Sequence, residues 1–229
     1  MKKSQLLLAA SILSFLVFPP TSQAAPPKAA AEPADGIAFV DAATNNGDFE
    51  EEGELKPWAG DYIYQGSEDG KATYPDNTIK VVKDPAFASH GSSYVSIQQN
   101  GGTERQQMGV RLLLGQLKGP NGGANIDLED GRTFTLSYDA RNGETGFAFP
   151  HAEMVCATPD GAVVLTGETL ASDPLSSEEW RTYRLKFLVP DNVNDLNHLE
   201  IRIALVMPNP QPEAIYQGFI DNVTLIQSK

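Results

Sequence analysis

Short apolar stretches recur along most of this chain, and turn residues separate them. In the clearest one, residues 132–141, the apolar or aromatic positions are Phe134, Leu136, Tyr138 and Ala140, with polar residues between them. Because successive side chains of a β-strand point to opposite faces, this stretch predicts a strand with one buried face. Alternating or continuous apolar residues predict further strands at 78–83, 93–98, 108–114, 182–189, 198–206 and 216–226.

Turn residues also predict how two strands are joined. Pro159-Asp160-Gly161 stands between the apolar stretches 153–157 and 162–165, an arrangement typical of a β-hairpin. From Ile37 onward we find no stretch of ten or more residues with helical periodicity, no internal repeat and no second linker. Many short strands without crossover helices predict an all-β fold, an antiparallel β-sandwich.

The first residues have the pattern of an export signal. Met1-Lys2-Lys3 is cationic, residues 6–18 are mostly apolar, and Ser22-Gln23-Ala24 places small residues before a cleavage point. We therefore expect residues 1–24 to be a secretory signal of bacterial appearance and the mature protein to be secreted or periplasmic. An uncut N-terminus that anchors the protein is the alternative. No later stretch approaches the ~20 apolar residues of a spanning helix, so we expect no membrane span.

The segment that follows the signal, residues 25–36, is rich in Ala and Pro and has no apolar periodicity. Such a composition is typical of a linker that has no packed core of its own. The remaining residues, 37–229, fit the usual size of a single domain.

Composition and charge exclude one class of partner and bear on how the domain is stabilised. The chain has 229 residues, with 17 Lys and Arg against 30 Asp and Glu, a net charge of -13. This charge repels phosphate backbones, so we expect no nucleic-acid partner. Cys156 is the only cysteine and cannot form an internal disulfide, so we expect it to be buried as a small apolar residue. Core packing or a metal ion must then stabilise the exported domain.

A family resemblance rests on several short motifs in a fixed order. They are Asn46-Gly-Asp-Phe-Glu50, Trp58, His90-Gly91, the stretch Gly131–Arg141, the stretch Ser177–Tyr183 and Gly218-Phe-Ile-Asp-Asn-Val-Thr-Leu225. In this order, over residues 41–226, the chain resembles the galactose-binding-like jelly rolls, specifically the carbohydrate-binding modules of the family 4, 9 and 22 type. The resemblance implies a jelly-roll β-sandwich and, less specifically, sugar binding.

The resemblance also implies a structural calcium site. The family's metal ligands fall on Glu50 and Asp221, with Asp48 as a further oxygen donor and with backbone carbonyls near Asp48 and in the turn 90–92. Calcium takes six to eight oxygen ligands, so two acids on the first and last strands suit it. The alternative is that backbone amides or a nearby cation satisfy these carboxylates.

Sugar recognition needs aromatic faces and a few polar side chains around them. The candidate ligand-binding residues are Trp58, Tyr62, Tyr64, Tyr74, Gln98 and Arg141. Three of these aromatic residues also have a structural alternative: Trp58 suits a core position, and Tyr62 with Tyr64 suits one covered strand face. Phe147 and Phe149 are expected to be buried.

The leading hypothesis is a secreted, noncatalytic protein that binds a poly- or oligosaccharide. The second is an extracellular or periplasmic structural module of the same fold that contacts a protein or the cell envelope. The third is a polysaccharide-cleaving enzyme in which His151, Tyr138 and Arg141 form a group. No His-x-x-x-His spacing and no Gly-x-Ser-x-Gly motif is present, so the sequence favours binding over catalysis.

Overall fold

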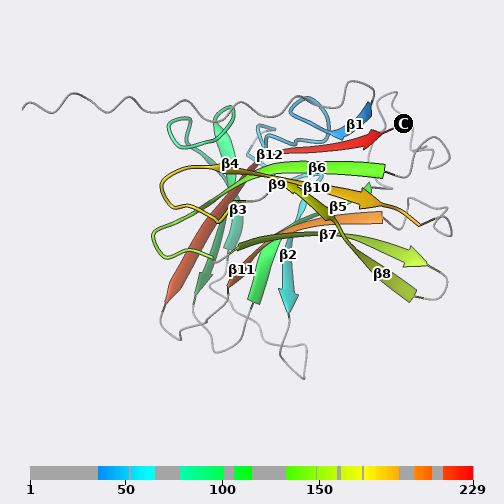
Figure 1. The fold of residues 1–229 in the computed structure, drawn as a ribbon. Coiled ribbons are helices and arrows are strands. Elements are labelled where there is room, and N and C mark those ends of the chain that lie inside the picture. Colours follow the sequence, from blue (N-terminus) through cyan, green and yellow to red (C-terminus); the bar gives the residue numbers. More distant parts are fainter. Residues whose placement is uncertain are drawn as a thin grey trace, which may run out of the picture. The chain divides into compact units, whose positions relative to one another are not determined.

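Two antiparallel β-sheets pack face to face in the computed structural model of the chain (Figure 1). The structure describes residues 36–51, 53–64, 78–100, 106–114, 133–147, 149–158, 161–171, 173–190, 199–207 and 214–228. These residues form strands, turns and loops, and in none of these ranges is there a helix long and apolar enough to cross a membrane. The all-β fold predicted from the sequence is confirmed.

The larger sheet has seven strands. Their order is β3 (Thr78–Lys83), β4 (Ser93–Asn100), β12 (Ile215–Ser228), β6 (Thr133–Asn142), β10 (Arg181–Leu188) and β9 (Glu168–Ala171), and β1 (Gly36–Val40) also pairs with β12. The long strand β12 thus pairs with β6 on one side and with β4 and then β1 on the other. A bulge interrupts its pairing with β6 between Asp221 and Thr224, where Asn222 has a φ of 48°.

The smaller sheet has five strands. Their order is β2 (Ala59–Tyr64), β5 (Gln106–Leu113), β11 (Leu199–Met207), β7 (Phe149–Thr158) and β8 (Gly161–Thr166). The predicted hairpin is present, because β7 and β8 pair from Glu153 with Thr166 to Thr158 with Gly161. Gly167 then carries the chain from β8 in this sheet to β9 in the other.

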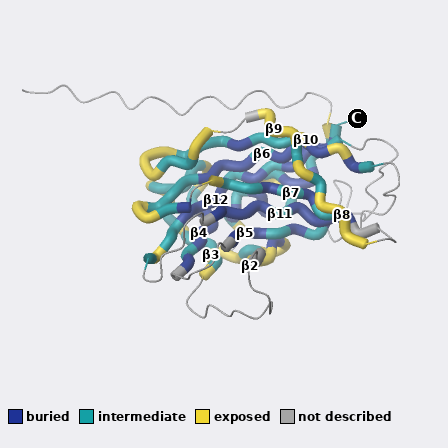
Figure 2. Tube along the Cα trace, turned by 60° about the horizontal axis from the view of Figure 1, so that its bottom comes forward, coloured by how far each residue is buried: buried dark blue, intermediate teal, exposed yellow. Residues whose placement is uncertain are grey.

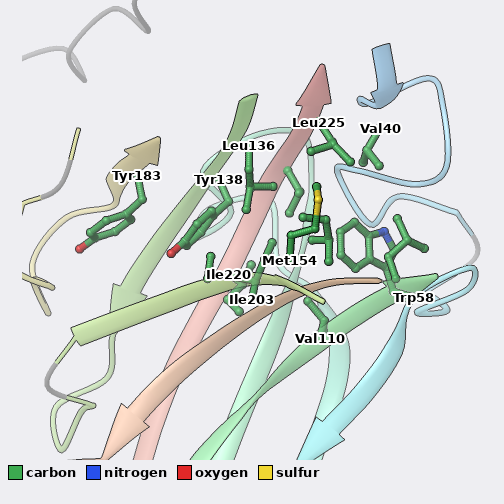
Figure 3. Close-up of a cluster of buried hydrophobic side chains, with 14 of the residues drawn as sticks. Val40, Trp58, Val110, Leu136, Tyr138, Met154, Tyr183, Ile203, Ile220 and Leu225 are labelled. Carbon is green, nitrogen blue, oxygen red and sulfur yellow. The ribbon is translucent and has the colours of Figure 1, made fainter. Parts of the chain in front are cut away.

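The core lies between the two sheets. Strand β6 contributes Phe134, Leu136, Tyr138 and Ala140, as its alternating pattern predicts, and each of these residues is buried. Strands β5, β7 and β11 of the other sheet contribute Met108, Val110, Met154, Ile201 and Ile203, among others. Figure 2 shows the buried central strands and the exposed edge strands β8 and β9, and Figure 3 shows part of this core. Cys156 is also buried in it, as expected.

Candidate functional site

The turn between β3 and β4 brings two of the predicted metal ligands together. Glu50 accepts hydrogen bonds from the backbone amide of Ser92, from the Ser92 hydroxyl at 2.6 Å and from the backbone amide of Ser93 at 2.6 Å. Asp221 accepts hydrogen bonds from the backbone amides of Ser89 at 2.8 Å and His90 at 3.0 Å. Residues 89–93 therefore connect the first loop of the domain to its last strand.

Asp48 does not belong to this group. Its carboxylate accepts a hydrogen bond from the backbone amide of Glu50 at 3.3 Å, which is a local contact two residues away. Among the residues that the structure describes, no three His, Cys, Asp or Glu side chains gather in a way that could hold a metal ion. The shared turn thus holds Glu50 and Asp221, whereas Asp48 makes a local contact, and the role of the three residues as metal ligands stays a prediction.

The two carboxylates differ in their electrostatic surroundings. Burial raises the pKa of Glu50, but hydrogen bonds from Ser92 and Ser93 outweigh it, so the pKa lies below its usual value. Burial raises the pKa of Asp221 to about 7, although hydrogen bonds from His90, Asn222 and Ser89 act in the opposite direction. No Lys or Arg within the described ranges forms an ion pair with either residue.

These surroundings suit a hard cation. Asp221 is a fully buried carboxylate whose charge is not balanced by a described basic side chain, and Glu50 is fixed against the same turn. Calcium prefers carboxylate and carbonyl oxygens, and a turn of five residues can supply the carbonyls. Backbone amides of the turn already donate to both carboxylates, which is the alternative to a metal site, and calcium binding stays a prediction.

The predicted sugar-binding residues that the structure describes lie on both sheets. Tyr62 and Tyr64 lie on β2 of the five-stranded sheet, where Tyr62 pairs with Met108; their side chains, like the whole of Tyr74, lie outside the described residues. Gln98 and Arg141 lie on β4 and β6 of the other sheet. The hypothesis that Gln98 and Arg141 orient a sugar stacked on the tyrosines of β2 stays a prediction, because the tyrosine side chains lie outside the described residues.

Trp58 is a core residue. Its side chain is 3 % exposed, its indole nitrogen donates a hydrogen bond to the carbonyl of Asn45 at 3.1 Å, and its ring lies 5.8 Å from that of Phe49. Figure 3 shows the indole among the buried side chains. Of the two roles considered for Trp58, the structure therefore assigns the core role and not the sugar-stacking role.

Arg141 is held in a cluster on the face of the seven-stranded sheet that points away from the core. Its guanidinium donates hydrogen bonds to the carbonyl of Ser177 at 2.9 and 3.2 Å and lies 4.3 Å above the ring of Phe87. The Phe87 ring also contacts Trp180 and Phe219. Arg141 thereby fixes the loop 84–92 against the sheet, and these contacts already use its charged group.

A connected series of charged side chains crosses the outer face of the five-stranded sheet. Arg111 of β5 contacts Glu200 of β11 at 3.2 Å, and Glu200 is also bound by the guanidinium of Arg202. Arg202 contacts Glu153 of β7 at 3.1 Å, and Glu153 contacts His151 at 3.2 Å. We call these five residues the charged series.

The charged series combines buried acids with accessible bases. The side chains of Glu200 and Glu153 are 9 and 13 % exposed, whereas those of Arg111 and His151 are 43 and 34 % exposed. The acids orient the guanidinium groups, and the accessible nitrogens remain at the surface as hydrogen-bond donors. Phe149 of β7, two residues from His151, is 41 % exposed, contrary to the expectation that it is buried.

Sequence reasoning did not identify this face. Charged residues do alternate with apolar ones in Gln106–Leu113 and Leu199–Met207, which would place Arg111, Glu200 and Arg202 on outward positions. The register pairs Arg202 with both Arg111 and Glu153. That pairing joins strands that are far apart in sequence. The alternation of charged and apolar residues can therefore predict that these charged side chains point outward, but it cannot predict which of them contact one another.

Comparisons with known proteins show which class of fold this is. No family model matches the chain, and no curated protein matches it by sequence. A solved structure of the CBM22-1 xylan-binding domain from Paenibacillus barcinonensis Xyn10C is similar, with a TM-score of 0.53 and 11% identity over 87% of this chain and 99% of that one. The tandem CBM22-1-CBM22-2 domain of the same enzyme gives a TM-score of 0.54 and 10% identity over 87% of this chain and 49% of that one.

One similar structure is an enzyme. The Stig cyclase Fisc from Fischerella sp. TAU, in complex with an indole-containing compound, has a TM-score of 0.51 and 18% identity over 85% of this chain and 98% of that one. At these identities the comparisons establish the fold. The chain has the β-sandwich fold of carbohydrate-binding modules, as the order of its sequence motifs predicts, and the same fold also occurs in a cyclase.

Proposed function

We propose that this protein is a noncatalytic module that binds a neutral poly- or oligosaccharide on the outer face of its five-stranded sheet. The charged series from Arg111 to His151 is the observation on which this proposal rests. Guanidinium and imidazole groups held by buried acids are fixed donors, and a sugar hydroxyl needs such donors. The fold shared with xylan-binding domains supports the proposal.

Each part of the face has a role in this proposal. Arg111 and His151, at the two ends of the charged series, donate to sugar hydroxyls, and Glu200 and Glu153 hold them in place. Phe149 offers an exposed ring for the apolar side of a pyranose. The net charge of -13 disfavours acidic polysaccharides, so the proposed ligand is a neutral glycan.

Calcium is part of the proposal as a structural ion. Glu50 and Asp221 would hold it together with carbonyl oxygens of the turn 89–93, and the ion would balance the buried charge of Asp221. Export is also part of it: residues 1–24 are proposed to be removed during secretion, and the module would act in the periplasm or outside the cell.

Affinity electrophoresis tests the proposal directly. The protein is run with calcium through gels that contain xylan, β-glucan, mannan or galactan, and retardation in at least one gel is expected. Arg111→Gln is expected to weaken binding about tenfold or more, because hydrogen bonds to charged groups are worth about 1.5–3 kcal/mol. Glu200 keeps Arg202 as a partner in this variant, so its stability should change little.

Lys186→Gln is the matched control, because Lys186 is an exposed base on β10 of the other sheet. It is expected to bind like the wild type. Absence of binding to every neutral polysaccharide would disprove the sugar proposal and leave the fold intact. If Arg111→Gln binds the polysaccharide as tightly as the wild type does, the sugar-binding site must lie elsewhere than on this face.

A second candidate function is a contact with another protein. Val163 and Val164 on β8, Leu170 on β9 and Leu188 on β10 are exposed apolar residues, with Leu188 68 % exposed. Exposed apolar residues on the edge strands β8 and β9 and on the adjacent β10 favour contacts with a further protein surface. Retention of a cell-envelope protein by the wild type, with loss in a Leu188→Lys variant, would support this function.

The polysaccharide-cleaving hypothesis required His151, Tyr138 and Arg141 to lie together, and the structure separates them. His151 and Tyr138 line one cleft, but Arg141 lies on the outer face of the seven-stranded sheet, bound to Ser177. Burial and the neighbouring Tyr183 hydroxyl also raise the pKa of Tyr138 far above its usual value, which opposes its use as a base. His151, Tyr138 and Arg141 therefore do not form one catalytic group.

A further inference from the structure

A cleft opens where the hairpin strand β8 leaves its partner. β8 pairs with β7 only from Glu153 onward, so residues 149–152 have no β8 partner. At Gly167 the chain crosses to the other sheet, where β9 pairs with residues 184–186 of β10 and leaves Tyr183 beyond its end. The resulting cleft between the sheets has a volume of about 530 Å³. It lies at the edge of the sandwich, beside the charged series.

The wall of the cleft is built mainly from rings and aliphatic carbon. Tyr138, Tyr183 and Ala152 form its buried part, and Phe149, Thr169 and Asp173 are among its exposed residues. A volume in this range, with an apolar wall and few polar groups, is typical of small-molecule sites.

One polar atom of this wall is unsatisfied. Tyr138 and Tyr183 are paired across β6 and β10, and their rings stack with centroids 5.5 Å apart and an interplanar angle of 24°. In Figure 3 both hydroxyl groups point to the same side, away from Met154 and Trp58. Tyr183 is 2 % exposed, and its hydroxyl has no hydrogen-bond partner within the described part of the chain. A buried hydroxyl without a partner is costly, so a ligand that supplies one gains free energy.

The chemistry of the cleft selects among ligand classes. The net charge of -13 and the carboxylate of Asp173 at the opening disfavour anions. Asp173 already has Arg181 at 3.6 Å, which lowers its value as a site for a cation. His151, Thr166 and Thr169 offer polar groups at the exposed part of the cleft, whereas its buried part offers the unsatisfied Tyr183 hydroxyl. A sugar placed against the buried part would therefore lose most of its hydrogen bonds. An apolar ring with a single polar group avoids this cost.

We propose that the cleft binds a small neutral ring compound that carries one hydrogen-bonding group. The ring lies against Leu185, Ala152 and the tyrosine pair, and its polar group hydrogen-bonds to the Tyr183 hydroxyl. At its opening this site shares Phe149 and His151 with the proposed sugar-binding face, but its buried wall comes from Tyr138 and Tyr183 of the other sheet.

Two probes that differ in one hydroxyl test the site. p-Cresol and toluene are titrated into the ¹⁵N-labelled protein, and affinities are measured from chemical-shift changes. The wild type is expected to bind p-cresol about five- to tenfold more tightly than toluene, which corresponds to one net hydrogen bond of about 1 kcal/mol. Tyr183→Phe keeps the ring but removes the hydroxyl, so the two probes are expected to bind this variant equally.

A second variant locates the site. Thr169→Trp fills the opening from the exposed edge strand β9 and is expected to reduce p-cresol binding at least tenfold. Leu170→Trp is its control, because Leu170 is exposed on the same strand and does not line the cleft, so binding should persist. The proposal is overturned if p-cresol does not bind at millimolar concentration, or if Thr169→Trp binds p-cresol as well as the wild type does. It is also overturned if methyl glucoside binds in the cleft more tightly than p-cresol.

Discussion

Glu50 and Asp221 accept hydrogen bonds from one and the same turn, residues 89–93, although they lie at opposite ends of the domain sequence. Four backbone amides of this turn point at the two carboxylates. The first loop, the β3–β4 turn and the last strand are thereby joined without a disulfide. Loss of either acid should therefore affect the stability of the whole sandwich.

Glu50→Gln is expected to lower the free energy of unfolding by about 1–3 kcal/mol, since an amide replaces a charged acceptor of three hydrogen bonds. Urea unfolding measures this change. If calcium binds here, a chelator lowers the melting temperature of the wild type, calcium restores it, and Glu50→Gln removes the response.

Glu54→Gln is the control for this experiment, because within the described ranges the Glu54 carboxylate forms just an exposed ion pair with Lys56 and should behave like the wild type. A wild-type melting curve that does not change in chelator would remove calcium from the proposal. The loss of stability in Glu50→Gln would still follow from its hydrogen bonds, so the two claims are tested separately.

Gly91 is the residue of the turn that allows Glu50 to approach. Its φ is 65°, and a Cβ atom there would lie 2.6 Å from a carboxylate oxygen of Glu50. Gly91→Ala is therefore expected to cost about 1–3 kcal/mol of unfolding free energy from strain, with a further loss from displacement of Glu50.

Gly53→Ala separates the two contributions, because Gly53 has a φ of 70° but nothing within 4 Å of an added Cβ. It carries the backbone cost alone and is expected to lose about 1 kcal/mol. Denaturant unfolding of both variants checks the difference. Equal losses would show that the contact with Glu50 contributes nothing.

Trp58 offers a test of its core assignment. Trp58→Phe removes the hydrogen bond to the Asn45 carbonyl and leaves space beside Phe49, so a loss of about 1–3 kcal/mol is expected, with sugar affinity unchanged. Trp180→Phe is a matched variant: Trp180 donates to the Phe87 carbonyl at 2.8 Å, but it is only partly buried, so its loss should be smaller. Reduced sugar binding by Trp58→Phe at unchanged stability would restore its role as a ligand-binding residue.

The fold could be predicted because most strands have a recognisable pattern of apolar residues in their own sequence. The predicted ranges 78–83 and 132–141 fall on β3 and β6, and the alternation in β6 correctly gives its buried face. β1 and β9 were not predicted, because they are short and their sequences, Gly-Ile-Ala-Phe-Val and Glu-Thr-Leu-Ala, show no clear alternation. Pairing with β12 and β10 places them in the sheet.

The candidate sites depend on information that is not local. The motifs that carry the family resemblance include Glu50 and Asp221, which the structure holds at one turn, whereas their role as metal ligands stays a prediction. The charged series needs the register of β5, β11 and β7, and aromatic residues alone did not indicate it. Aromatic residues do not by themselves predict which side chains are exposed. Trp58 and Phe149 both lie near strand ends, yet Trp58 is buried and Phe149 is 41 % exposed.

Cys156 gives a final prediction, which concerns pH. The residue is fully buried, and burial raises the pKa of its thiol to about 11. The thiolate is the reactive form, so a thiol reagent such as DTNB is expected not to label the native protein at pH 8 and to label it fully in urea.

Between pH 9 and about 11 the unfolded thiol loses its proton while the native thiol keeps it, so this group lowers the free energy of unfolding as the pH rises. Cys156→Ala should show a smaller decrease over the same range, and rapid labelling of the native wild type at pH 8 would contradict the buried assignment.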